Sequence, residues 1–232
     1  MSLLLLIDTT TEMCSASVSE NGLVLMEACE ATGYSHGQLL TDFIATVLKR
    51  SNKTLDQLDA VAISDGPGSY TGLRIGASVA KGICYALAKP LIAVPTLEAM
   101  ADFMVKKNQQ QKGWYVPLID ARRMDAFYAI YDEKMIVVET SDFTTLDESF
   151  FNKLKIQCGG QVFLGGNGVK KIKPLHINGF GTIIDNVENR SSNLSSLADK
   201  LFHHQKFQSV NQYEPNYLKN FQGTIPRASI IH

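Results

Sequence analysis

The sequence predicts an α/β protein of two lobes, and three features support this fold class. The apolar run Asp59–Ser64 has the length and branched residues of a buried strand. It is followed by the glycine turn Gly66–Gly68 and by a segment of helical pattern that begins at Thr71. Apolar runs of strand length alternate with amphipathic segments on both sides of this stretch. The polar run Lys106–Gly113 then reads as a linker to the second half of the chain.

The first lobe is expected over residues 1–107. It opens with three predicted strands, at Ser2–Ile7, Cys14–Ser19 and Leu23–Cys29. Asn21-Gly22 between the last two apolar runs is a strong signal for a hairpin turn. The wide apolar stripe that follows predicts a helix over Ser35–Arg50.

The central helix is expected over Thr71–Lys89, with Ser69 or Thr71 as its N-cap and Pro90 after its end. A short strand at Leu91–Val94 and a helix over Thr96–Lys107, capped by Thr96, complete the first lobe.

Residues 108–232 are expected to form a smaller α/β lobe. Its predicted strands are Trp114–Asp120, Ala126–Tyr131, Ile136–Glu139 and Gln161–Leu164. Its single predicted helix is Ser195–His204. The tail Phe221–His232 is expected to lie outside the core.

The glycine turn does not match the phosphate-binding or nucleophile patterns that share its strand–turn–helix setting. The lysine of a Walker loop is missing, and Thr71 stands where the dinucleotide pattern has its third glycine. Pro67 stands two residues before Ser69, where a hydrolase elbow has glycine. We therefore expect Asp65 and the turn Gly66–Gly68 to have a structural role, which is to set the start of the central helix.

Several stretches resemble the signature of the bacterial TsaB (YeaZ) family. In the first half they are Leu6–Thr10, His36 with Leu39 and Leu40, Ser64–Gly76 and Val94–Ala99. Weaker matches in the second half are Asp120–Arg123, Gly165–Gly168 and Pro215–Lys219.

This resemblance implies the actin-like ATPase fold of sugar kinases, Hsp70 and actin, which is ribonuclease H-like. It also implies a non-catalytic scaffold or activator that pairs with the TsaD transferase, with the TsaE ATPase, to form threonylcarbamoyladenosine at position 37 of tRNAs reading codons that begin with A. ATP or ADP could bind at the heterodimer, and tRNA would bind only through the complex.

The two predicted helices Ser35–Arg50 and Thr71–Lys89 have faces suited to a partner. The first has a wider apolar stripe than one core contact needs, and the second presents small residues every four positions. We expect a four-helix bundle with TsaD, or a homodimer when TsaD is absent. The alternative is that both stripes face only the protein's own sheet. The expected interface residues are Leu40, Phe43, Ile44, Val47, Gly72, Ile75, Gly76, Val79 and Ala80.

A second hypothesis is an ATPase or phosphotransferase of the actin-like type, with a weak nucleotide site at Asp8, Gly165, Gly166 and Gly168. The resemblance implies an acidic residue near ATP and magnesium at the end of the first strand. Thr9–Thr11 follow Asp8, however, and branched residues hinder the close approach of a phosphate. We therefore expect Asp8 to be a turn or capping residue and no cofactor to be firmly bound.

A third hypothesis, a peptidase of the glycoprotease-like type, lacks a nucleophile and a metal site. Thr96 and Met100 stand where the transferase family has two metal-binding histidines, and neither is a good ligand for a catalytic divalent metal. His36 is expected in the first turn of its helix, while the adjacent His203 and His204 face different sides of theirs.

Composition sets further limits. A net charge of −1 over 232 residues gives no basic field for nucleic acid, so tRNA binding by this chain alone is not expected. The cysteines show no paired spacing and no apolar run has the length of a membrane span, which predicts a cytoplasmic protein. Asp120, Arg122 and Arg123 could bind phosphate or join the lobes by ion pairs, and the sequence leaves both readings open.

Overall fold

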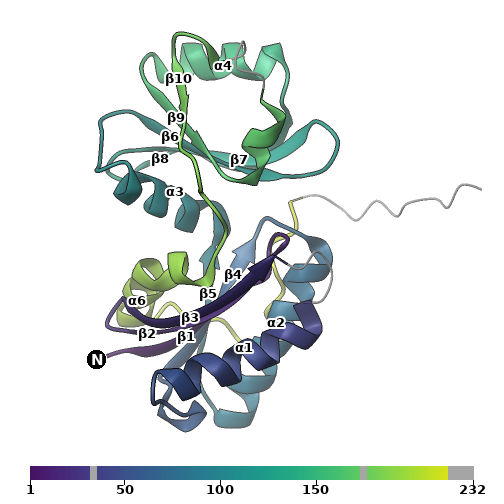
Figure 1. The fold of residues 1–232 in the computed structure, drawn as a ribbon, viewed down its shortest axis with the longest axis vertical. Helices are drawn as coiled ribbons and strands as arrows, with labels where there is room; N and C mark the ends of the chain where they lie inside the picture. Colours follow the sequence, from purple (N-terminus) through teal and green to yellow (C-terminus); the bar gives the residue numbers. More distant parts are fainter. Residues whose placement is uncertain (32–35, 173–176, 219–232) are drawn as a thin grey trace, which may run out of the picture.

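The computed structural model describes residues 1–31, 36–172 and 177–218. They form two five-stranded sheets, one above the other, with helices between them and on their outer faces (Figure 1). The expected α/β class is therefore confirmed.

The first sheet has the strand order β3-β2-β1-β4-β5. Its strands are β1 (Leu3–Asp8), β2 (Met13–Glu20), β3 (Leu23–Ala31), β4 (Ala60–Gly66) and β5 (Leu91–Pro95). The first three form an antiparallel meander, whereas β4 and β5 run parallel to β1. The hairpin predicted at Asn21-Gly22 is confirmed, because both residues have positive φ and join β2 to β3.

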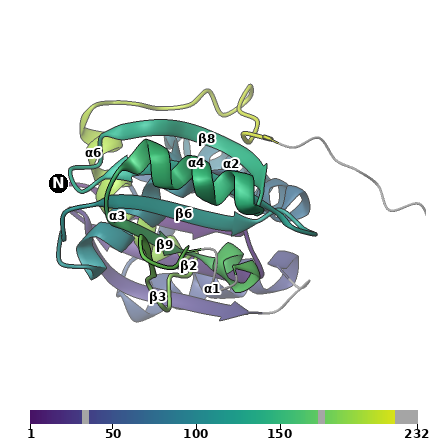
Figure 2. The ribbon, with the colours of Figure 1, turned by 90° about the horizontal axis from the view of Figure 1, so that it is seen from above.

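The second sheet has the order β10-β9-β6-β7-β8. Its strands are β6 (Trp114–Asp120), β7 (Asp125–Asp132), β8 (Val137–Thr145), β9 (Val162–Gly165) and β10 (Gly181–Ile183). Helix α4 (Glu148–Cys158) covers its outer face and lies over the sheet in the view from above (Figure 2). Neither α4 nor β10 was predicted.

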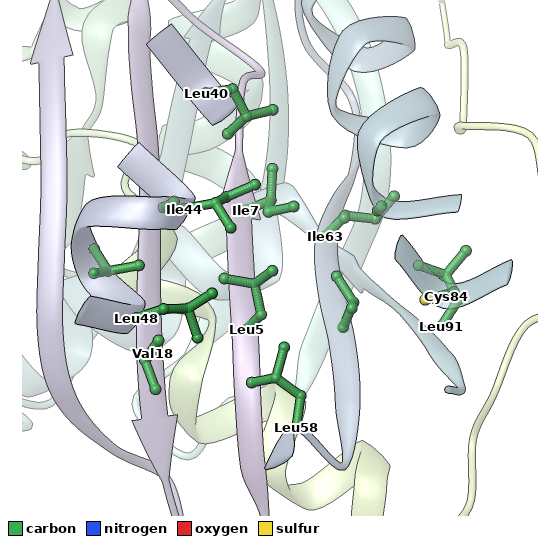
Figure 3. Packing of buried hydrophobic residues seen from close by; sticks show 14 of the residues in the cluster. Leu5, Ile7, Val18, Leu40, Ile44, Leu48, Leu58, Ile63, Cys84 and Leu91 are labelled. Atoms are coloured by element: carbon green, nitrogen blue, oxygen red, sulfur yellow. The ribbon is translucent and has the colours of Figure 1, made fainter. Parts of the chain in front are cut away.

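Helices α1 (His36–Arg50) and α2 (Tyr70–Leu87) cover the outer face of the first sheet. Figure 3 shows Leu40 and Ile44 of α1 pointing toward Leu5 and Ile7 of β1. Cys84 of α2 packs in the same core, and burial raises its pKa to about 11, as expected for an inert thiol.

Helices α3 (Thr96–Lys107) and α6 (Ser195–His203) lie between the two sheets (Figure 1). Leu97 and Met104 of α3 pack on the second sheet, while Leu197 and Ala198 of α6 pack on the first. The chain thus returns to the first sheet after it has built the second. The boundary expected at residue 107 stays a prediction.

Residues 208–217, named here the C-terminal strap, follow α6 along the edge of the first sheet. The Gln208 N–H donates to the Leu91 carbonyl at 2.8 Å, and the Tyr213 hydroxyl donates to the Asp65 carboxylate at 2.8 Å. The tail Phe221–His232 lies outside the described residues. Within the described ranges, every helix is too short or too polar to cross a membrane.

Candidate partner interface

The glycine turn between β4 and α2 packs on the end of β1. Ser69 is the N-cap of α2, as predicted, and its hydroxyl accepts the Gly72 N–H at 3.3 Å. The Ser69 N–H donates to the Thr10 carbonyl oxygen at 2.7 Å, and a Cβ on Gly68 would lie 2.6 Å from that same oxygen. The turn thus needs a residue without a side chain at position 68, which supports its structural role.

The small-residue face of α2 lies against β1 of the same chain. A Cβ on Gly72 would lie 1.9 Å from the Thr9 carbonyl oxygen, and one on Gly76 would lie 2.5 Å from the Thr9 hydroxyl. Ala80, one turn further along, is fully buried in the core below α2. The expectation that this face meets a partner helix is therefore wrong.

Most of the expected interface residues are buried and leave little surface for a partner. The buried ones are Leu40, Ile44, Val47, Gly72, Gly76 and Ala80. Phe43, Ile75 and Val79 are half-buried and remain candidates. The width of a helical stripe can be read from periodicity, but the part of it that the sheet covers depends on how each helix is turned on the sheet.

The open surface of α1 and α2 lies further around each helix. Thr71, Ser78 and Gly82 of α2 are exposed. Among the described residues, and apart from its chain neighbours and the backbone of its own helix, no atom lies within 4 Å of a Cβ built on Gly82. These small residues flank the half-buried apolar side chains where α1 and α2 lie side by side. We name the set the helix-pair face, and its members are Leu39, Phe43, Thr71, Ile75, Ser78, Val79, Gly82 and Ile83.

The interface predicted from the sequence includes Phe43, Ile75 and Val79 of this face, and the members that it missed are Leu39, Thr71, Ser78, Gly82 and Ile83. Leu39 and Phe43 are four residues apart on α1, and Ile75, Val79 and Ile83 repeat every four residues on α2. Such spacing places each set on one side of its helix, so a signal was present in the sequence.

Arg74 is exposed beside the helix-pair face and is held by two aromatic rings. Its guanidinium carbon lies 4.3 Å from the centroid of the Tyr70 ring, and its Nε donates to the Tyr217 hydroxyl at 3.4 Å. Because Tyr217 belongs to the C-terminal strap, the strap contributes to the surface around the start of α2.

The Asp8 carboxylate is enclosed by donors from its own lobe. It accepts the N–H of Thr10 at 2.9 Å, the hydroxyl of Thr10 at 2.7 Å and the hydroxyl of Ser64. Burial raises the pKa of Asp8, and these hydrogen bonds oppose that rise. With 2% of its surface exposed, Asp8 has the contacts of a turn residue rather than those of an open ligand.

The Gly165–Gly168 loop is also packed rather than open. A Cβ on Gly166 would lie 2.3 Å from the Leu118 carbonyl oxygen and 2.5 Å from the Met100 methyl carbon. Gly166 has a φ of +105°, which also favours glycine. The loop thus packs β9 against β6 and α3. The hydrogen bonds of the Asp8 carboxylate, by contrast, all come from Thr10 and Ser64 of the first lobe, so they do not link Asp8 to this loop.

The positions compared with metal-binding histidines are used for packing. The prediction that Thr96 caps α3 is wrong: Pro95 is the N-cap, and the Thr96 hydroxyl accepts the Gly66 N–H at 3.0 Å. Met100 is buried against Gly166. His36 begins α1, as predicted. Among the residues the structure describes, no three His, Cys, Asp or Glu side chains gather to hold a metal ion.

Comparison with known proteins places these features among tRNA-modification proteins. The family described as TsaD, tRNA N6-adenosine threonylcarbamoyltransferase, matches residues 29–155. The tRNA threonylcarbamoyladenosine biosynthesis protein TsaB of Escherichia coli (strain K12) is 29% identical over 94% of both chains. The protein of the same name from Bacillus subtilis (strain 168) is 26% identical over 70% of both chains.

Solved structures give the fold. YeaZ from Pseudomonas aeruginosa has a TM-score of 0.77 at 24% identity, over 94% of this chain and 100% of that chain. An inorganic polyphosphate/ATP-glucomannokinase from Arthrobacter sp. strain KM has a TM-score of 0.52 at 10% identity, over 88% of this chain and 100% of that chain. These likenesses confirm the expected fold of the actin-like and sugar kinase type.

Proposed function

This chain belongs to the family described as TsaD, tRNA N6-adenosine threonylcarbamoyltransferase, and within it to the TsaB (YeaZ) proteins of tRNA threonylcarbamoyladenosine biosynthesis; from that premise we propose that it is a non-catalytic subunit that pairs with the TsaD transferase. In this role the chain acts as a scaffold and activator, and the transfer reaction takes place on its partner.

The observation that carries this proposal is the helix-pair face. Phe43, Ile75 and Val79 leave apolar surface exposed to water, which a partner would cover. Ser78 and Gly82 leave room beside them for the backbone of a second helix. Two helices of a partner laid on α1 and α2 would complete a four-helix bundle. The same face could pair with its copy in a homodimer when the partner is absent.

Two further observations support a role without catalysis. Thr96 and Met100 are occupied in packing at the positions compared with the transferase's metal ligands. The Asp8 carboxylate is satisfied by Thr10 and Ser64 and is buried. The residue types and contacts at both places suit a structural role.

In this proposal the TsaE ATPase acts on the assembled pair, and any ATP or ADP binds at the heterodimer. The complex works in the cytoplasm and holds the tRNA whose adenosine at position 37, in tRNAs that read codons beginning with A, is modified. The net charge of −1 supports binding of tRNA by the complex rather than by this chain alone.

Reconstitution tests the proposal. TsaD and TsaE of the same organism would be incubated with tRNA and the pathway's substrates, with and without this chain, and the modified nucleoside would be measured by mass spectrometry of digested tRNA. We expect modification only when this chain and TsaD are both present. Modification by this chain without TsaD, or full modification by TsaD without this chain, would contradict the proposal.

A further inference from the structure

The turn between β6 and β7 carries two consecutive arginines in an unusual backbone conformation. Arg122 has a φ of 70° and Arg123 a φ of 48°. Each residue of positive φ favours glycine or asparagine, because large side chains adopt this conformation reluctantly. Two arginines therefore occupy positions where the backbone conformation by itself favours smaller residues.

The acid beside these arginines is already engaged. The Asp120 carboxylate accepts the Arg122 N–H at 2.6 Å and pairs with the Lys171 ammonium at 2.5 Å. Lys171 also donates to the Asp125 carbonyl oxygen at 2.8 Å. Asp120 and Lys171 both belong to the second sheet and the segment packed on it, so this ion pair holds the turn in place and does not join the two lobes.

Two exposed arginines on this turn and one exposed lysine on the neighbouring segment Asn167–Lys171 remain. Arg122, Arg123 and Lys170 are all exposed, and Lys170 directly precedes the lysine that pairs with Asp120. No hydrogen bond or ion pair is recorded for any of these three side chains within residues 1–31, 36–172 and 177–218. We name Arg122, Arg123 and Lys170 the cationic tip.

We propose that the cationic tip contacts the phosphate backbone of tRNA in the assembled complex. This inference rests on the proposed function, which supplies a tRNA substrate. Guanidinium groups bind phosphate oxygens bidentately, and arginine and lysine are among the side chains that contact nucleic-acid backbones. The contacts of Asp120 and Lys171 hold the turn and so fix the backbone positions of the two arginines, which lowers the conformational entropy lost when the arginines bind phosphate.

An extended polyanion fits this surface better than a free nucleotide does. The neighbouring glycine loop is packed against Leu118 and Met100, so its glycines are not open to a nucleotide's phosphates. Two surface hollows, of about 430 and 400 Å³, lie on the first lobe beside Pro90 and Tyr213, away from the tip. The tip itself is an exposed hairpin turn, a shape that can lie along an RNA strand. Three contacts are too few to hold tRNA alone, in keeping with the chain's net charge of −1.

The test compares two double variants with the same change of charge. Arg122→Gln/Arg123→Gln removes the tip's arginines, whereas Lys134→Gln/Lys155→Gln removes two exposed lysines from the β7–β8 turn and from α4. Lys134 lies at the opposite end of β7 from the tip, so it serves as a matched control. The tRNA affinity of each variant's complex with TsaD would be measured over a range of salt concentrations.

We expect the arginine variant to bind tRNA at least about tenfold more weakly at low salt, with a salt slope smaller by about 1.4 to 1.8, as loss of two phosphate contacts predicts. The lysine variant should bind like the parent. Equal affinity and slope for the two double variants would overturn the proposal, as would an arginine variant that loses ATP binding while it retains tRNA binding.

A second variant separates binding from folding. Arg122→Asn/Arg123→Gly removes the same charges but supplies residues that adopt positive φ readily, so it should melt no lower than the parent and still lose tRNA affinity. Full tRNA binding by this variant would also overturn the proposal. The affinity of each variant for TsaD, measured separately without tRNA, should equal that of the parent. A parent chain that does not bind TsaD would remove the proposed function and this site with it.

Discussion

The Thr9 carbonyl oxygen lies 1.9 Å from the point that a Cβ on Gly72 would occupy. Non-bonded atoms do not approach so closely, so α2 can lie on the end of β1 only with glycine at this position. Gly76 extends the contact, since its Cβ would lie 2.5 Å from the Thr9 hydroxyl. The glycine repeat of α2 is therefore a contact between helix and strand within one chain.

Gly76→Leu is expected to destabilise the fold. The leucine side chain would have to displace Thr9, and overpacking of this kind typically costs about 1–3 kcal/mol or more. The free energy of unfolding, measured by chemical denaturation, should fall by at least that amount. Gly82→Leu, on the open side of the same helix, is the matched control and should change it by less than about 1 kcal/mol. A Gly76 variant as stable as its control would show that the helix is not seated on β1.

Asp8→Asn is expected to raise stability at neutral pH. Burial raises the pKa of Asp8 above its ordinary 3.8, so the folded state keeps a proton that the unfolded state releases. This residue's contribution to stability is therefore largest below about pH 4 and falls as the pH rises toward the folded-state pKa. Asparagine can accept the hydrogen bonds from Thr10 without a charge.

Denaturation of the Asp8→Asn variant and the parent at several pH values between about 4 and 7 measures this effect. The advantage of the variant should grow with rising pH. Asp8→Ala, which leaves the Thr10 and Ser64 donors without their acceptor, should be less stable than Asp8→Asn at every pH. If the stability of the asparagine variant relative to the parent fell as the pH rises, the charged carboxylate would be the favoured form in the folded protein.

Tyr213→Phe is expected to loosen the C-terminal strap. The change removes the hydroxyl that donates to Asp65 at 2.8 Å, in a place where burial raises the pKa of that carboxyl. Leaving a partly buried carboxyl without this donor should lower the free energy of unfolding by about 1–3 kcal/mol. Tyr85→Phe removes a hydroxyl from a side chain that is 78% exposed and should have no measurable effect. Equal melting of the two variants would show that the hydrogen bond from Tyr213 to the Asp65 carboxylate does not anchor the strap.

Local signals in the sequence were sufficient for most of the secondary structure. Helix α3 and strand β6 have the predicted bounds, because a clear apolar pattern and adjacent turn residues mark both. Helix α4 was missed although Asp147 caps it by accepting the Phe150 N–H at 3.0 Å, a signal that was present in the sequence. The strap was beyond sequence reasoning, since Tyr213 finds Asp65 across 148 positions of the chain.

The predicted interface included the side of α2 that packs against Thr9 of the same chain, and the structure corrects that part of the prediction. That α1 and α2 carry the interface stays a prediction. Glycine and alanine every four residues mark a close approach, but the spacing is the same whether a strand or a partner helix makes it. The close contact of Gly72 and Gly76 with Thr9 shows that the approach is made by the protein's own chain and not by a partner helix. Gly82 lies four residues after Ser78, a small-residue spacing like that of the buried repeat Gly72, Gly76 and Ala80, and the predicted interface included only the buried repeat.

The most direct measurement of the central claim is the affinity of this chain for the TsaD transferase, by calorimetry, for the parent, Gly82→Ala and Gly82→Leu. Gly82→Ala fills little space and should stabilise α2 by up to about 1 kcal/mol while binding TsaD like the parent. Gly82→Leu should stay folded and bind at least about tenfold more weakly, which corresponds to about 1.4 kcal/mol. A folded Gly82→Leu variant that binds TsaD as tightly as the parent would contradict the claim that α2 presents this face to its partner.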